Sequence, residues 1–162
     1  MVSRQFHYTK RNVFMPFLLA EILNFQGSAH LRGVGSFSNL LEAWNENDNI
    51  EFSIEDCTPN EIQSESVAII KQVLSTKIGQ ADYMIAIIGK HSDDKHPNSD
   101  EIGYKNWQAY EIDKNHEKGN GLVVVKLDSS YYAPDEAYNI GAEWVNSFNL
   151  DDILEALNDL QE

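Results

Sequence analysis

Trp107 and Glu111 lie four residues apart in the segment 106–112, Asn-Trp-Gln-Ala-Tyr-Glu-Ile. If this segment is helical, a rotation of about 100° per residue places both side chains within about 40° on one face. An aromatic ring then lies one turn from a carboxylate. The apolar run 83–88 ends shortly before, at Gly89, so the pair follows the carboxyl end of an expected buried strand. Open α/β sheets bind ligands at that end.

Apolar runs alternate with helical patterns along the chain, and this alternation predicts how the pair is positioned. The expected strands are 12–17, 50–54, 83–88, 122–127 and a short edge strand at 143–145, and the main expected helices are 37–44, 67–78, 107–118 and 150–160. Such alternation indicates an α/β fold with a mostly parallel sheet. Four or five strands in one domain, 1–162, favour a three-layer, flavodoxin-like order 2-1-3-4-5.

The switch point of that order lies between the first and third strands, where a site is expected. The carboxyl ends of these strands carry Phe14 in the first and Ser92 after the third. Trp44, in contrast, lies at helical spacing with other apolar residues and is expected in the core. We therefore expect a candidate site built by Glu111, Trp107, Phe14 and Ser92.

The formal net charge of −14 limits the classes of ligand. A protein that binds a nucleic-acid backbone needs Lys/Arg patches, so no nucleic-acid partner is expected. A small anionic ligand is still compatible, because backbone N–H groups or one Lys can hold it. No apolar segment resembles a signal peptide or reaches the length of a membrane span, so we expect a cytoplasmic protein without a membrane partner.

Three other patterns are expected to carry no chemistry. Cys57 is the only cysteine, which excludes an intramolecular disulfide, and its acidic neighbours disfavour a reactive thiolate. Gly33-Val34-Gly35 lacks the third glycine of a dinucleotide-binding fingerprint. The spacing of His91 and His96 matches no zinc pattern, so the acidic segment 91–103 is expected to be a solvated loop and not a metal site.

Three segments resemble a Toll/interleukin-1 receptor (TIR) domain, from residue 12 to about 125 and more weakly to the end. Residues 13–17, Val-Phe-Met-Pro-Phe, resemble the aromatic first strand of the family. Residues 81–92, Ala-Asp-Tyr-Met-Ile-Ala-Ile-Ile-Gly-Lys-His-Ser, resemble its third strand and loop. Residues 107–112 match its Trp-x-x-x-Glu-Ile helix start, the most specific of the three. The closest likeness is to TIR-like proteins of bacterial Thoeris antiphage systems.

This resemblance implies an enzyme that cleaves the nicotinamide–ribose bond of NAD⁺, with Glu111 as the catalytic residue. Trp107 would supply a wall for a ring, Phe14 and the loop starting at Asp56 would border the cleft, and Ser92 would donate to a phosphate or ribose oxygen. NAD⁺ is then a substrate, and no cofactor is needed. The resemblance further implies an ADP-ribose-derived signal, in some members cyclic, for a separate effector protein, and self-assembly of the chain.

One carboxylate is chemically sufficient for this bond. Ordinary glycosidases use two carboxylates because one must protonate the leaving oxygen. Nicotinamide instead leaves a cation as a neutral base and needs no general acid. A single carboxylate near the anomeric carbon can stabilise the oxocarbenium-like transition state.

Two other functions are compatible with the same residues. Pro16 stands where the TIR family has Ser, and its acidic residue after the first strand has no recognisable counterpart, which favours a non-catalytic TIR-like interaction module. A nucleoside deoxyribosyltransferase-like enzyme also uses a Glu on a similar fold. The chain carries no second carboxylate motif that would support that activity.

Overall fold

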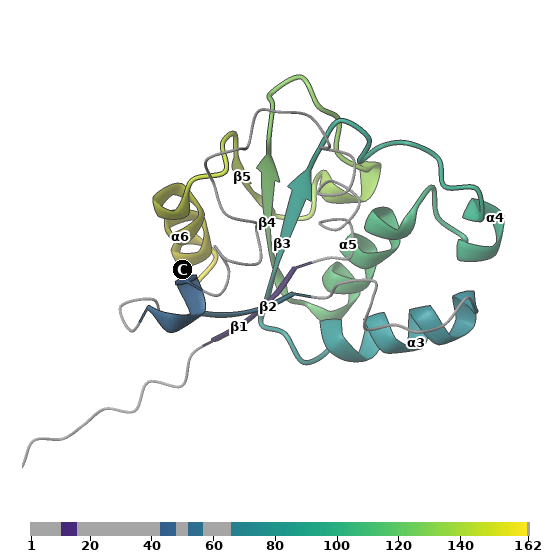
Figure 1. Ribbon diagram of the computed structural model, residues 1–162, viewed down its shortest axis with the longest axis horizontal. Coiled ribbons are helices and arrows are strands. Elements are labelled where there is room, and N and C mark those ends of the chain that lie inside the picture. Colours follow the sequence, from purple (N-terminus) through teal and green to yellow (C-terminus); the bar gives the residue numbers. More distant parts are fainter. Residues whose placement is uncertain (1–10, 16–42, 48–51, 57–65, 162) are drawn as a thin grey trace, which may run out of the picture.

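The computed structural model describes residues 11–15, 43–47, 52–56 and 66–161, with the side chains of 54–56 excepted. Five strands form one all-parallel sheet in the order β2-β1-β3-β4-β5 (Figure 1). They are β1 (Arg11–Met15), β2 (Phe52–Asp56), β3 (Tyr83–Ile88), β4 (Gly121–Lys126) and β5 (Glu143–Val145). The α/β, flavodoxin-like topology expected from the sequence is confirmed.

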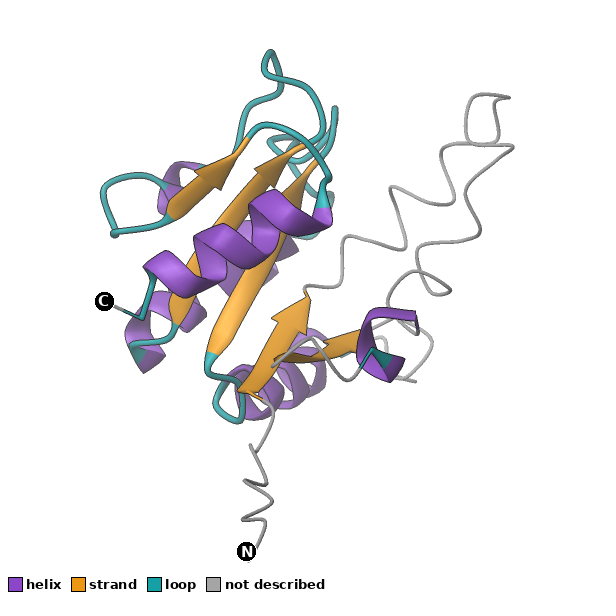
Figure 2. Ribbon diagram, turned by 90° about the vertical axis from the view of Figure 1, so that its left-hand side faces the viewer, coloured by secondary structure: helices purple, strands orange, loops and turns teal. Residues whose placement is uncertain are grey.

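Helices cover both faces of the sheet and make it a three-layer structure. On one face lie α3 (Val67–Ile78) and α5 (Trp107–Lys118), and α6 (Leu150–Asp159) covers the other. In Figure 2, α6 crosses in front of the strands. Two short elements, α4 (Ser99–Ile102) and the 3₁₀ turn η2 (Asp135–Ala137), belong to the connections.

Two apolar layers form because successive side chains of a strand point to opposite faces. The α3/α5 side contains Met84, Ala86 and Ile88 of β3, and the α6 side contains Tyr83, Ile85 and Ile87. All six residues of β3 are buried, as expected of a central parallel strand. The layers therefore hold β3 and the start of α5 in fixed positions relative to each other.

The ends of the helices follow the capping signals of the sequence. The side chain of Asn106 accepts a hydrogen bond from the backbone N–H of Ala109 at the start of α5. Gly119 ends this helix with φ 76°, a left-handed conformation that glycine adopts without strain. Asn149 caps α6 and Gly79 ends α3, both as expected.

Several expectations from the sequence need correction at their boundaries. The second strand is Phe52–Asp56 and does not end at residue 54, so Asp56 is a strand residue and does not begin the loop. The fourth strand begins at Gly121, one residue early. Trp44 is buried, which confirms its place in the core. Residues 43–46 are helical, which confirms the end of the helix expected at 37–44, and the segment 16–42, with the rest of that helix and the glycines, lies outside the described residues.

The expected solvated loop 91–103 contains a helical turn, α4, that the sequence did not reveal. Its residues Ser99 and Ile102 are buried, although the turn is otherwise acidic. Elsewhere in the described parts of the chain, no helix combines the length and the apolar character that crossing a bilayer requires.

Candidate functional site

Glu111 is completely buried, with an exposed fraction of 0%. It lies in the second turn of α5, and this helix starts at the carboxyl end of the sheet and runs back along β3 and β4 (Figure 1). Carboxylates are almost never fully buried in a fold, because removing their charge from water is costly. Residues that break such rules concentrate at functional sites. The burial of Glu111 therefore marks this part of α5 as the candidate site.

Trp107 lies one turn before Glu111 and is also buried, at 7% exposed. Its ring meets the ring of Tyr110 edge-on, with centroids 5.8 Å apart at 90°. Tyr110 in turn donates a hydrogen bond from its hydroxyl to the carbonyl of Lys71 in α3. These contacts hold the indole against Tyr110 in the apolar layer that α5 shares with α3.

The electrostatic environment of Tyr110 reflects this enclosure. Burial raises the pKa of the Tyr110 hydroxyl, and the charges of Glu117 and Glu111 add to the rise, whereas Lys114 opposes it. The phenol therefore stays neutral well into the alkaline range. It acts as a neutral hydrogen-bond donor that links α5 to α3.

Asn106 connects the start of α5 to the loop that follows β3. Its Oδ1 accepts from the N–H of Ala109 at 2.9 Å, while its Nδ2 donates to the carbonyls of Ser92 and Asp94, both at 2.9 Å. The side chain is only 6% exposed. One amide thus sets the direction of the helix that carries Trp107 and Glu111. The sequence indicates the cap, since Asn is a favoured cap residue, but not the two contacts across the loop.

Ser92 closes the turn at the carboxyl end of β3. Its hydroxyl oxygen accepts from the N–H of Gly89 at 2.8 Å, and the residue is 1% exposed. Among the described residues, none accepts the hydroxyl proton. The proton can therefore be donated to a ligand oxygen, as the sequence prediction for Ser92 requires.

Phe14 and Asp56 lie in adjacent rows of the sheet, both below the carboxyl end of β3. Phe14 pairs with Met84, four residues before the last residue of β3, which corresponds to about 13 Å along the strand. It is buried in the same apolar cluster as Trp107. Phe14 is therefore a core residue beneath the carboxyl edge. Asp56 ends β2 opposite Met15, and its side chain lies outside the described part of the structure.

Gln108 is a polar residue of this region that the sequence reasoning missed. Its Nε2 donates to the carbonyl of Ile87 at 3.0 Å, and the side chain is 1% exposed. Its Oε1 has no hydrogen-bond partner in the described structure. Gln108 precedes Glu111 by three residues, a spacing that makes neighbours on a helix surface. It therefore places an available acceptor beside the buried carboxylate.

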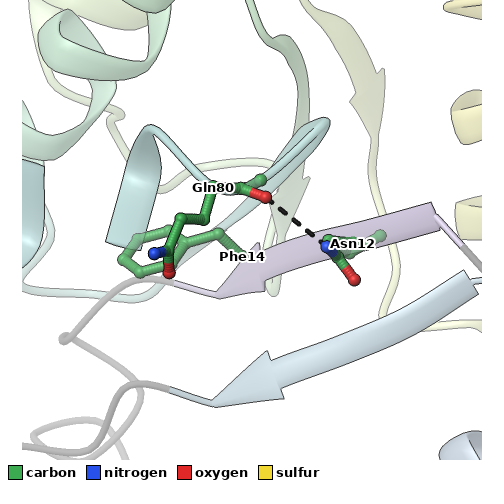
Figure 3. A pocket seen from close by; sticks show the side chains of 5 residues that line it. Asn12, Phe14 and Gln80 are labelled. Atoms are coloured by element: carbon green, nitrogen blue, oxygen red, sulfur yellow. Dashed lines mark hydrogen bonds between the residues drawn. The ribbon is translucent and has the colours of Figure 1, made fainter. Parts of the chain in front are cut away.

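A hollow of about 400 Å³ lies at the opposite end of the sheet, where β3 begins. Its lining residues are Asn12, Val13, Phe14, Gln80 and Ala81. Figure 3 shows the side chain of Asn12 donating to the carbonyl of Gln80, at 3.5 Å. The lining contains no titratable side chain, and ligands of open α/β sheets bind at the other end. We assign this hollow no catalytic role.

A hydrogen bond of 2.6 Å joins His91 Nδ1 and Asp94 Oδ2 at the surface, and Lys105 forms an ion pair with Asp93 at 2.6 Å. Within the described ranges, no three His, Cys, Asp or Glu side chains are grouped so that they could hold a metal ion.

No protein-family model matches the sequence, and no curated protein matches it significantly.

Proposed function

We propose that the chain is a TIR-like enzyme that cleaves the nicotinamide–ribose bond of NAD⁺, with Glu111 as the catalytic carboxylate. The observation that supports this most is the complete burial of Glu111, one turn after Trp107 on the helix that starts at the carboxyl end of the sheet. The sheet order 2-1-3-4-5 matches the topology that the resemblance implies. In this proposal, the ADP-ribose moiety becomes a signal, linear or cyclic, for a separate effector protein in antiphage defence.

The reaction develops positive charge on the ribose, and this charge must form in a site from which water is excluded. As nicotinamide leaves, positive charge develops on the ribose, and the Glu111 carboxylate stabilises it. Electrostatic stabilisation is strong where water is excluded. Trp107 bounds the space beside the ring, and the Ser92 hydroxyl donates to a ribose or phosphate oxygen. Because Glu111 is 0% exposed here, entry of NAD⁺ requires local opening around α5.

The fate of the ADP-ribose moiety depends on what reaches the cationic ribose first. If water is excluded while a second nucleophile is held close, cyclisation or transfer is faster than hydrolysis. The buried position of Glu111 favours that outcome. The proposal therefore includes an acceptor other than water.

Release of nicotinamide from NAD⁺ tests the proposal directly. Purified protein is incubated with NAD⁺, with phage-infected lysate added if pure protein is silent, and nucleotides are separated by chromatography. Glu111→Gln should lower the rate at least about 100-fold, because it removes the charge and keeps the shape. Glu117→Gln is the matched control on the same helix, since Glu117 is half exposed and its ion pair within the described residues is with Lys114. Equal rates for the wild type and Glu111→Gln would remove Glu111 from the mechanism.

The complete burial of Glu111 also favours a second candidate function, a non-catalytic TIR-like module that binds partners or further copies of itself. In that case, Glu111 serves the packing of α5. Glu111→Gln would then leave partner binding unchanged, and the wild type would release no nicotinamide under any condition tested. The same chromatogram, combined with a binding assay, distinguishes the two functions.

A further inference from the structure

An exposed aromatic pair lies at the β5 edge of the sheet. The rings of Tyr138 and Trp144 stack with centroids 5.1 Å apart at 26°. Tyr138 is 42% exposed and Trp144 is 37% exposed. The other two tryptophans, Trp44 and Trp107, are buried. Aromatic side chains are enriched in protein interfaces, so an exposed stack of this kind needs an explanation.

The chain around this pair carries negative charge only. Residues 127–162 contain nine Asp or Glu and no Lys, Arg or His. None of the acidic residues described in this stretch has an ion-pair partner among the described residues. Asp135 and Glu136 form the η2 turn, and the N–H of Tyr138 bonds to the carbonyl of Asp135 at 3.1 Å. Two carboxylates thus lie one turn from the exposed rings.

The position of β5 leaves this region open. β5 is the last strand of the order β2-β1-β3-β4-β5, and within the described residues no strand pairs with its outer side (Figure 1). Val145 points into the α6 layer, so Trp144, its neighbour, points to the opposite face. The η2 turn packs through Ala137 in the α3/α5 layer, so this turn and the Trp144 ring lie on the same side of the sheet, away from α6.

We propose that Asp135, Glu136, Tyr138 and Trp144 form a docking surface for a Lys- or Arg-bearing segment of a partner protein. Lysine and arginine cations bind to the faces of Trp and Tyr rings, and nearby carboxylates attract the same cations by charge. The negative charge of residues 127–162 attracts such a segment and repels an acidic one. This inference does not depend on NAD⁺ cleavage, because none of these residues belongs to the candidate site.

A basic peptide tests the surface. The probe is a ten-residue acetylated peptide in which Arg and Lys alternate with Ser and Gly, and the control peptide carries Gln in place of each Arg and Lys. Binding to the full chain is followed in 0.15 M salt by tryptophan emission, since Trp144 is the exposed tryptophan. Saturable binding of the basic peptide and none of the Gln peptide is expected.

The variants separate this surface from general negative charge. Tyr138→Ala with Trp144→Ala should weaken binding by about 5- to 30-fold, as expected for two exposed cation–π contacts. Because these changes can alter emission, their affinities are measured by calorimetry. Asp135→Asn with Glu136→Gln should weaken binding to a similar degree. Glu155→Gln with Asp159→Asn makes the same change of charge on α6 and should weaken binding much less, because these residues lie outside the docking surface.

Two results would overturn the proposal. One is equal weakening by both pairs of charge changes, because the peptide would then respond to net charge alone. The other is a dimer of the wild type in sedimentation that Trp144→Ala abolishes, because a second copy of the chain would then occupy the surface. Trp144→Phe should keep most of the affinity, and thermal melts confirm that each variant is folded.

Discussion

Asn106→Ala should destabilise the protein by about 3 kcal/mol. Loss of an Asn cap costs about 1 kcal/mol, and each of the other two hydrogen bonds contributes about 1 kcal/mol. The bonds to Ala109 and Ser92 are buried, and the bond to Asp94 is partly buried. For a chain of this size, the loss corresponds to about 6 to 12 °C in melting temperature.

Urea unfolding measures this loss, with Asn149→Ala as the matched control. Asn149 also caps a helix, but its side chain makes a single bond, to the N–H of Asp151 at 2.8 Å, at an exposed position. The control should therefore cost about 1 kcal/mol. Asn106→Asp keeps the cap acceptor but sets a carboxylate oxygen against the two carbonyl oxygens, so its cost should be at least that of Asn106→Ala. If Asn106→Ala and Asn149→Ala cost the same, the contacts to Ser92 and Asp94 do not stabilise the fold.

Three further changes have defined outcomes. The hydrogen bond to Asp113 and, to a lesser degree, burial raise the pKa of Tyr104. Its contribution to the free energy of unfolding is therefore complete below about pH 10 and is lost at higher pH, and Tyr104→Phe should flatten the alkaline decline in urea titrations. Gly121→Ala should cost about 1 to 3 kcal/mol in the same assay, because the new Cβ would lie 2.7 Å from Cδ1 of Tyr83. Gln108→Met should change the free energy of unfolding by less than about 1 kcal/mol, because it removes one hydrogen bond together with a buried oxygen that has no partner. A larger loss of unfolding free energy would mean that Gln108 Oε1 accepts a hydrogen bond in the folded protein.

The sheet could be predicted from the sequence where composition changes sharply. β3 has the expected bounds because six apolar residues lie between Asp82 and Gly89. The alternation at 50–54 was less informative. Pairing with β1 extends β2 through two acidic residues to Asp56, and backbone bonds between strands do not depend on side-chain polarity. Helix ends were predictable from Asn149 and Gly119, which have strong positional preferences.

The candidate site was predictable only in part. The i,i+4 spacing placed Trp107 and Glu111 together on α5, but the depth of Glu111 depends on packing that no local pattern encodes. The level of Phe14 depends on the register between β1 and β3, and two apolar strands can pair in several registers. The contacts of Asn106 reach back 12 and 14 residues, beyond the range of any periodicity.

The two apolar layers of the sheet each contain one tryptophan. Trp44 stacks on Phe148 in the α6 layer, with centroids 5.6 Å apart, and Trp107 lies in the α3/α5 layer. Variants that keep only one of these indoles therefore provide a separate optical reporter for each side of the molecule. Simultaneous melting of both signals would indicate that the layers unfold together. A ligand that enters beside α5 should shift the emission of Trp107 while Trp44, screened by the intervening strands, remains silent.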